Sequence, residues 1–167
     1  MARGKHHKSE SMDPSSEQGL NDNDTGVPGM LNEVLADSYV LMLKTQACHW
    51  TAKGPWFFGL HKLTEAQYGE LFEAIDVMAE RVRSLGAQPP LSMSDMLERA
   101  TIAELDTVLS TEATVRLLAE DHDTLSAHAQ EAADQAEENG DPASHDLLVS
   151  RIAAHDKAAW LLRSHLG

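Results

Sequence analysis

Four side chains in one predicted helix have the types and the spacing of metal ligands. His61 and Glu65 lie four residues apart, and Asp76 and Glu80 repeat that spacing further along the chain. Side chains four residues apart share one face of a helix, and at about 100° per residue all four fall within one sector of about 100°. Imidazole nitrogens and carboxylate oxygens together suit iron or another divalent first-row metal. The alternative for such pairs is an ordinary solvated helix face.

The two pairs cannot bind the same metal ion within one chain. His61 and Asp76 are 15 residues apart, which is about 22 Å along a helix axis. An antiparallel copy of this helix across a two-fold axis would place His61 and Glu65 of one copy opposite Asp76 and Glu80 of the other. The spacing therefore predicts two identical mixed sites at a contact between two copies of the chain.

His49, near the end of the preceding predicted helix, is a fifth candidate ligand. If the break at Gly54-Pro55 folds that helix back along the next one, His49 supplies an extra nitrogen. We predict that it lies beside Asp76 and Glu80 of its own chain, while His61 serves the symmetry-related site. The alternative is a structural histidine.

An intra-chain di-iron centre is disfavoured by the sequence. Di-iron carboxylate bundles place Glu-x-x-His pairs inside the bundle, and no Glu of this chain has a His three residues later. This pattern favours a site between chains over one inside the bundle.

The elements that position these residues are predicted to be four long helices without strands. Apolar residues recur at three- and four-residue steps over residues 30–53, 60–85, 105–138 and 147–166. A longer connection after Pro89-Pro90 contains SMSDML, in which Ser94 is a candidate cap for a short helix. The pattern predicts an all-α four-helix bundle with a crossover between the second and third long helices.

Composition limits the classes of function. The chain has 167 residues and a formal net charge of −14, which suits a protein that attracts cations and argues against binding nucleic acid or anionic lipid by bulk charge. No apolar run approaches the length of about 18 residues that spans a membrane. The single Cys48 excludes an intrachain disulfide and is expected to be a packing residue. A cytoplasmic location is expected from these features.

The chain divides into a tail and one domain. Residues 1–29 are polar and are predicted to be a disordered tail, whereas residues 30–167 are predicted to form the bundle. The tip of the tail is basic, with Arg3, Lys5 and Lys8, and an acidic segment follows it.

Two stretches resemble the Dps family of mini-ferritins. Residues 44–86 contain His-Trp, Gly-Pro-x-Phe, Leu-His-x-x-x-Glu and Asp-x-x-x-Glu-Arg in the order and spacing of that family. Residues 155–166, HDKAAWLLRSHL, are similar to its last helix. The resemblance covers about residues 30–167 and leaves the tail unexplained.

The resemblance implies a dodecameric shell of ferritin-like four-helix bundles, each with a short helix in the crossover. It implies that ferrous iron is oxidised at inter-subunit di-iron ferroxidase centres, commonly by hydrogen peroxide, and that ferric mineral is stored in the cavity, which protects DNA. The ferroxidase positions of the family match His49, Asp76 and Glu80 of one subunit with His61 and Glu65 of its neighbour.

The resemblance also implies roles outside the centre. Trp50 is expected to intercept stray oxidising equivalents, or else to be a packing anchor at the interface. Acidic side chains near the junction of the last two helices are expected to line an iron-entry pore: Glu137, Glu138, Asp141 and Asp146. The alternative is a solvated helix end, with Asp141 as a helix cap.

DNA binding is the second functional hypothesis. Many Dps proteins bind and compact DNA through basic tails, and Arg3, Lys5 and Lys8 would be the phosphate contacts here. The acidic segment behind this tip and the acidic body oppose such binding. A nucleoid-associated protein therefore remains the alternative to an iron-oxidising one.

Overall fold

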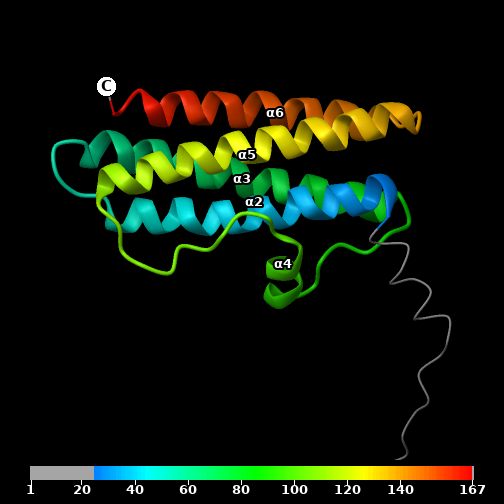
Figure 1. Cartoon of the computed structure of the whole chain (residues 1–167), viewed down its shortest axis with the longest axis horizontal. Helices are drawn as coiled ribbons and strands as arrows, with labels where there is room; N and C mark the ends of the chain where they lie inside the picture. The colour runs from blue at the N-terminus through cyan, green and yellow to red at the C-terminus, as the bar shows by residue number, and fades with distance from the viewer. Residues whose placement is uncertain (1–24, 167) are drawn as a thin grey trace, which may run out of the picture.

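A computed structural model describes residues 25–166 and contains four long helices and one short one (Figure 1). The long helices are α2 (Gly26–Thr51), α3 (Phe57–Ser84), α5 (Thr111–Glu138) and α6 (Pro142–Arg163). The short helix α4 (Met93–Arg99) lies in the crossover between α3 and α5, which runs along the outer side of α2. The predicted all-α four-helix bundle with a crossover helix is confirmed. None of the helices in residues 25–166 combines the length and hydrophobicity of a membrane span.

All four long helices start at a different residue from the sequence-based prediction, and α3 begins at Phe57 rather than Leu60. α2 begins at Gly26 rather than Met30, because the buried Val27 already packs into the core and Pro28 fits a first helical turn. α5 begins at Thr111 rather than Leu105, since Ser110 caps it by accepting a hydrogen bond from the backbone N–H of Ala113. The apolar residues between 105 and 110 belong to the extended crossover instead.

The remaining differences, like the start of α5, are explained by capping. α6 begins at Pro142 rather than Leu147, with Asp141 as its N-cap. α4 is capped by Ser92 rather than Ser94, because the Ser92 hydroxyl accepts from the backbone N–H of Asp95. Caps act through side-chain hydrogen bonds that hydrophobic periodicity does not report.

The bundle has a continuous apolar core. α5 packs along α6 and α2 along α3, and the crossover closes over α2. The core includes large side chains that are fully buried: Leu31, Leu35, Leu41, Leu60, Leu71, Met78, Leu118, Leu125, Leu148 and Leu162. Cys48 is buried among them, and burial raises the pKa of its thiol to about 11. The thiol is therefore a packing group, as the sequence predicted.

Two buried charges of α2 anchor the crossover. The Asp37 carboxylate accepts hydrogen bonds from the backbone N–H groups of Thr101 and Ile102, at 2.6 and 3.0 Å. Lys44 donates to the backbone oxygen of Ala103 at 2.9 Å and pairs with Asp121 of α5 at 2.5 Å. These contacts fix the crossover to α2, together with the buried apolar side chains of Met96 and Ile102.

The core also contains a buried pair of histidines. Nδ1 of His122 on α5 lies 3.0 Å from Nδ1 of His155 on α6, and the residues are 2% and 0% exposed. Because one Nδ1 must donate and the other accept, the two rings adopt different neutral tautomers. Burial first, and then the charge of Arg151, lower the pKa of His122 to about 4 and that of His155 to about 2.

The first prediction concerns the stability of the bundle against pH. Both pKa values lie below the ordinary value of 6.5, so the unfolded chain binds more protons as the pH falls below 6.5. The stability that the bundle gains by keeping both histidines neutral is fully present above pH 6.5 and is lost on acidification. The loss is on the order of 2 kcal/mol for each buried histidine at about pH 5. Chemical unfolding at pH 7.5 and pH 5 should show this loss.

His155→Gln should lose less stability between these two pH values than the natural chain. His145→Gln, which alters a partly exposed histidine of the same helix, serves as the matched control. An unchanged pH dependence in His155→Gln would contradict the prediction.

Candidate metal centre

One half of the candidate centre consists of two stacked histidines of the same chain. The rings of His49 and His61 lie 3.7 Å apart between centroids, with 16° between their planes. Nδ1 of His49 donates to the backbone oxygen of His61 at 2.9 Å, and Nδ1 of His61 donates to the backbone oxygen of His49 at 3.1 Å. Since a carbonyl oxygen can only accept, each Nδ1 holds the proton and each Nε2 has a lone pair for a metal.

This stacking corrects the predicted grouping of His49. His49 lies beside His61, not beside Asp76 and Glu80 of its own chain, because the turn at Gly54 sends α3 straight back along α2. Gly54 adopts a φ of 85°, which the short turn requires and glycine permits. Asp76 is 15 residues beyond His61 on the same straight helix, about 22 Å away along its axis. Both imidazoles therefore belong to the same half-site.

Neighbouring side chains hold the two rings in place. The edge of the Tyr68 ring meets His49 at 5.3 Å between centroids, and Phe57 lies over His61 at 5.1 Å. The hydroxyl of the buried Thr64 lies 3.5 Å from Nδ1 of His49. Sequence reasoning missed these supporting residues, because their spacing from the histidines has a meaning only after α2 and α3 are folded together.

The third member of this half-site, Glu65, lies one turn after His61 on α3. Its exposed carboxylate accepts a hydrogen bond from Lys62 at 2.6 Å. The hydrogen bond and the charge of Lys62, followed by the weaker influence of His49 and His61, lower the pKa of Glu65. The carboxylate is thus ionised, as a metal ligand must be.

The other half of the candidate centre is Asp76 with Glu80, which are exposed one turn apart on α3. Within residues 25–166 of a single chain, no three His, Cys, Asp or Glu side chains come together closely enough to hold a metal ion. Each half alone therefore offers too few ligands, and the arrangement of one chain fits a site that a second chain completes.

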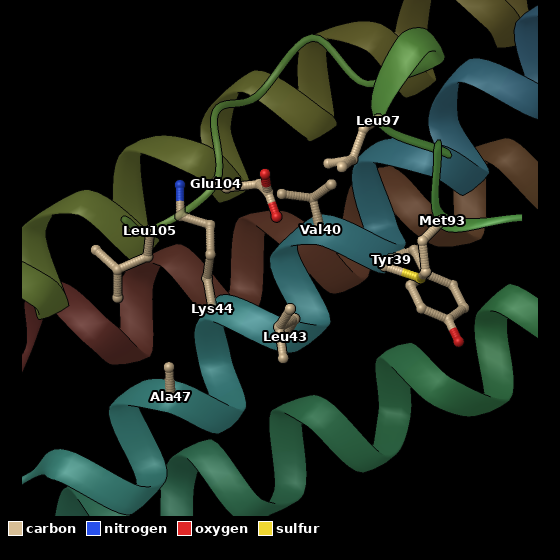
Figure 2. A pocket seen from close by; sticks show the side chains of 9 residues that line it. All are labelled: Tyr39, Val40, Leu43, Lys44, Ala47, Met93, Leu97, Glu104 and Leu105. Carbon is tan, nitrogen blue, oxygen red and sulfur yellow. The ribbon is translucent and has the colours of Figure 1, made fainter. Parts of the chain in front are cut away.

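Apolar side chains are exposed next to both halves. Trp50 follows His49 and is 67% exposed, and Phe72 lies on α3 between the two halves and is 68% exposed. An apolar groove between α2 and α4 is lined by Leu43, Met93 and Leu97 (Figure 2). Exposed apolar surface of this extent beside polar ligands is typical of an interaction site.

The four acidic residues predicted to line a pore have different surroundings. Asp141 accepts from the backbone N–H of Ser144 at 3.1 Å and from Arg81 at 2.6 Å. Burial acts to raise the pKa of Asp141, but the hydrogen bonds from Arg81 and Ser144 outweigh it and lower that pKa to about 2. The capping alternative is therefore confirmed for Asp141. Glu137, Glu138 and Asp146 are exposed around the same junction of α5 and α6.

The basic residues of the predicted DNA contact, Arg3, Lys5 and Lys8, lie outside the described residues. The same holds for most of the predicted tail. DNA binding by this segment stays a prediction.

Comparison with known proteins agrees with the fold. Residues 29–167 match the model of the ferritin-like domain, so the chain is a ferritin-like protein. It is 33% identical to DNA protection during starvation protein 2 of Bacillus anthracis, over 82% of this chain and 94% of that protein. It is 41% identical to a low temperature-induced protein of Nostoc, over 84% of this chain and 80% of that protein.

A solved structure of the same fold gives the narrower class. The crystal structure of a Dps protein from Bacillus brevis superposes with a TM-score of 0.81 at 34% identity, covering 93% of this chain and 100% of that one. The chain belongs to the Dps family of ferritin-like proteins.

The second prediction concerns the ion pair at the half-site. Because Lys62 competes with a metal ion for the Glu65 carboxylate, Lys62→Met should strengthen metal binding. Because solvent screens an exposed ion pair, the gain in affinity should be small, roughly five-fold at most. Calorimetric titration with Co²⁺, which resists oxidation by air, measures the change. Lys157→Met on α6 is the control, and an affinity that falls in Lys62→Met would contradict the competition.

Proposed function

We propose that this protein oxidises ferrous iron at di-iron centres shared between two copies of the chain. The ferric product is stored inside a dodecameric shell. The observation that carries the proposal is that the candidate ligands form two incomplete half-sites, which lie far apart along the straight helix α3. His49, His61 and Glu65 form one half, and Asp76 with Glu80 forms the other.

The spacing along α3 fits a two-fold axis. His61 with Glu80, and Glu65 with Asp76, have the same midpoint, which lies between residues 70 and 71. An antiparallel copy of α3 centred there brings the two pairs of ligands together at both ends. One contact between two copies would thus complete two centres.

The residues at that midpoint suit a close contact between helices. The same symmetry places Phe72 of one copy opposite Gly69 of the other, and both positions lie in the sector of the ligands. A Cβ atom at Gly69 would meet no atom of its own chain within 4 Å. The space beside Gly69 can therefore receive the exposed Phe72 ring of the second copy. The groove of Leu43, Met93 and Leu97 adds apolar surface beside this contact.

The five ligands suit ferrous iron as a substrate. Three carboxylates offset three of the four positive charges of two ferrous ions, and two Nε2 lone pairs fix the position of the ions without filling every coordination site. Hydrogen peroxide then takes one electron from each ferrous ion, its O–O bond breaks, and two protons complete two water molecules. Because one peroxide molecule receives both electrons at the same centre, hydroxyl radical is released less often. The Bacillus anthracis relative is named as a DNA protection protein, which agrees with this outcome.

Trp50 and the acidic junction have supporting roles in this proposal. Trp50 is adjacent to His49 in the sequence and exposed, so it can intercept an oxidising equivalent or anchor the second copy. Glu137, Glu138 and Asp146 supply negative charge where ferrous iron would enter the shell. Asp141 contributes by holding the start of α6 in place.

The third prediction tests whether the centre is shared. His49→Ala/His61→Ala removes one half of each site, and Asp76→Ala/Glu80→Ala removes the other. Each variant alone should lose rapid ferric absorbance after ferrous iron and peroxide are mixed. In a mixed pair, one site has both halves intact and the other has neither. Co-assembly at equal amounts should therefore restore about a quarter of the natural rate, because half of randomly formed pairs are mixed.

The outcomes separate the activity from its location. If the natural chain shows no oxidation beyond a protein-free control, the activity itself is wrong. If co-assembly is verified by tandem affinity tags and no activity returns, the sharing of ligands is wrong. Glu131→Gln, an exposed carboxylate of α5, controls for the loss of charge alone.

The fourth prediction tests the register of the contact. Gly69→Trp should leave the helix content unchanged, since space surrounds this position within one chain. The indole would collide with Phe72 of the second copy, so the rate of iron oxidation should fall at least ten-fold and the two-fold pair should dissociate. Light scattering and the oxidation assay measure both effects. Ala127→Trp on the exposed side of α5 is the control, and a fully active Gly69→Trp assembly would rule out this register.

A further inference from the structure

The midpoint of the candidate ligands is also the midpoint of the helix that presents them. α3 runs from Phe57 to Ser84, so its middle lies between residues 70 and 71, as does the middle of both ligand pairs. An antiparallel copy of α3 centred there overlaps the helix along its whole length. The first turn of one copy therefore lies beside the last turn of the other, just outside each candidate metal centre.

Phe58 is an exposed aromatic side chain in this first turn. It is 72% exposed, so its own chain leaves most of the ring uncovered. Taking His61 as the origin of the helical angle, Phe58 lies at about 60° and Phe72 at about 20°. Both therefore fall in the sector of the ligands, whereas the other exposed large apolar side chains of α3, Phe57 and Val77, lie outside it. Phe58 thus faces the second copy near the end of the contact.

The two-fold symmetry places Arg83 of the second copy opposite Phe58. The two residues are equally distant from the midpoint, and the angle of Arg83 is about 40°, inside the same sector. Phe58 precedes His61 by three residues, and Arg83 follows Glu80 by three. The pair therefore lies one helical turn outside the imidazole and the carboxylate that the contact brings together.

Hydrogen bonds within its own chain hold the guanidinium of Arg83 in place. Nη1 donates to the backbone oxygen of Ala87 and to Oε1 of Gln88, each at 2.8 Å. Because the N–H groups of a guanidinium lie in its plane, these bonds leave the flat faces of the group open for stacking. A planar cation held in this way is a favourable partner for an aromatic ring.

We propose that Phe58 of one copy stacks on the Arg83 guanidinium of the other and closes the outer end of each candidate metal centre. The inference rests on the two-fold contact of the proposed function and assigns two positioning residues to the same site. Because it fixes the first turn of one helix against the last turn of the other, the contact sets the spacing between His61 and Glu80 of the second copy. One two-fold axis makes two such contacts.

The fifth prediction tests this contact by cross-linking, without iron. A chain with Phe58→Cys and a differently tagged chain with Arg83→Cys are co-assembled and treated with a short bifunctional maleimide. A covalent product that joins the unlike chains through positions 58 and 83 should form. Replacing Arg83→Cys by Arg116→Cys, on the exposed side of α5, should give no such product. The natural Cys48 does not compete, because it is buried and the pKa of its thiol is raised to about 11.

The outcomes separate the contact from the activity. If the unlike chains co-assemble and no product joins positions 58 and 83, the contact is wrong, whether or not the natural chain oxidises iron. If the product forms but the natural chain oxidises no iron, the contact stands and the proposed function is wrong. Within one chain the two positions are 25 residues apart, about 37 Å along α3, so a short reagent joins them only between copies.

Co²⁺ titration tests the positioning role. Phe58→Leu and Arg83→Met should each weaken Co²⁺ binding by roughly five-fold, the scale of one cation–π contact. The double variant should be no weaker than either single one, because both remove the same contact. Phe58→Tyr keeps the aromatic face and should bind like the natural chain. Losses that add in the double variant, or a Phe58→Tyr as weak as Phe58→Leu, would overturn this role. If a variant fails to assemble, the cross-link still decides the contact.

Discussion

The rigidity of α3 is the constraint on which the site depends. A straight helix keeps His61 and Asp76 about 22 Å apart, so one chain can present only half of a ligand set at each place. The two halves have a common midpoint near Gly69 and Phe72, where a second copy can approach closely. In the proposed assembly, the contact between copies and the chemistry are therefore the same event.

The nitrogen half-site is organised before any metal is bound. The two reciprocal hydrogen bonds between His49 and His61 fix both tautomers, and Tyr68 and Phe57 restrict the rings. The carboxylates, by contrast, are exposed and adjustable. Fixed imidazoles with exposed carboxylates suit the proposed site, where the metal is a substrate that enters, is oxidised and leaves as mineral, because the ligands need not enclose it permanently.

The interior of the bundle contains buried charged and polar side chains as well as apolar ones. Asp37 and Lys44 anchor the crossover, and their partners satisfy the buried charges. The histidine pair and Gln67 are not satisfied in this way. Nε2 of His122, Nε2 of His155 and Oε1 of Gln67 are buried without a hydrogen-bond partner among the described residues. Arg151 belongs to the same cluster. It pairs with Glu70, and its charge helps to lower the pKa of both histidines. The same cluster should make the bundle sensitive to acid.

The sequence by itself determined the number and order of the long helices, because hydrophobic periodicity is a local property. It also determined that His61 and Glu65 cannot meet Asp76 and Glu80 within one chain, since helical rise is fixed per residue. Only the tertiary structure decided to which half-site His49 belongs, because its position beside His61 depends on the angle of the turn at Gly54. The start of α5 at Thr111 depends on a local side-chain cap by Ser110, and the pairing of His122 with His155 depends on the contact between two helices. Such contacts leave no periodic trace in the chain.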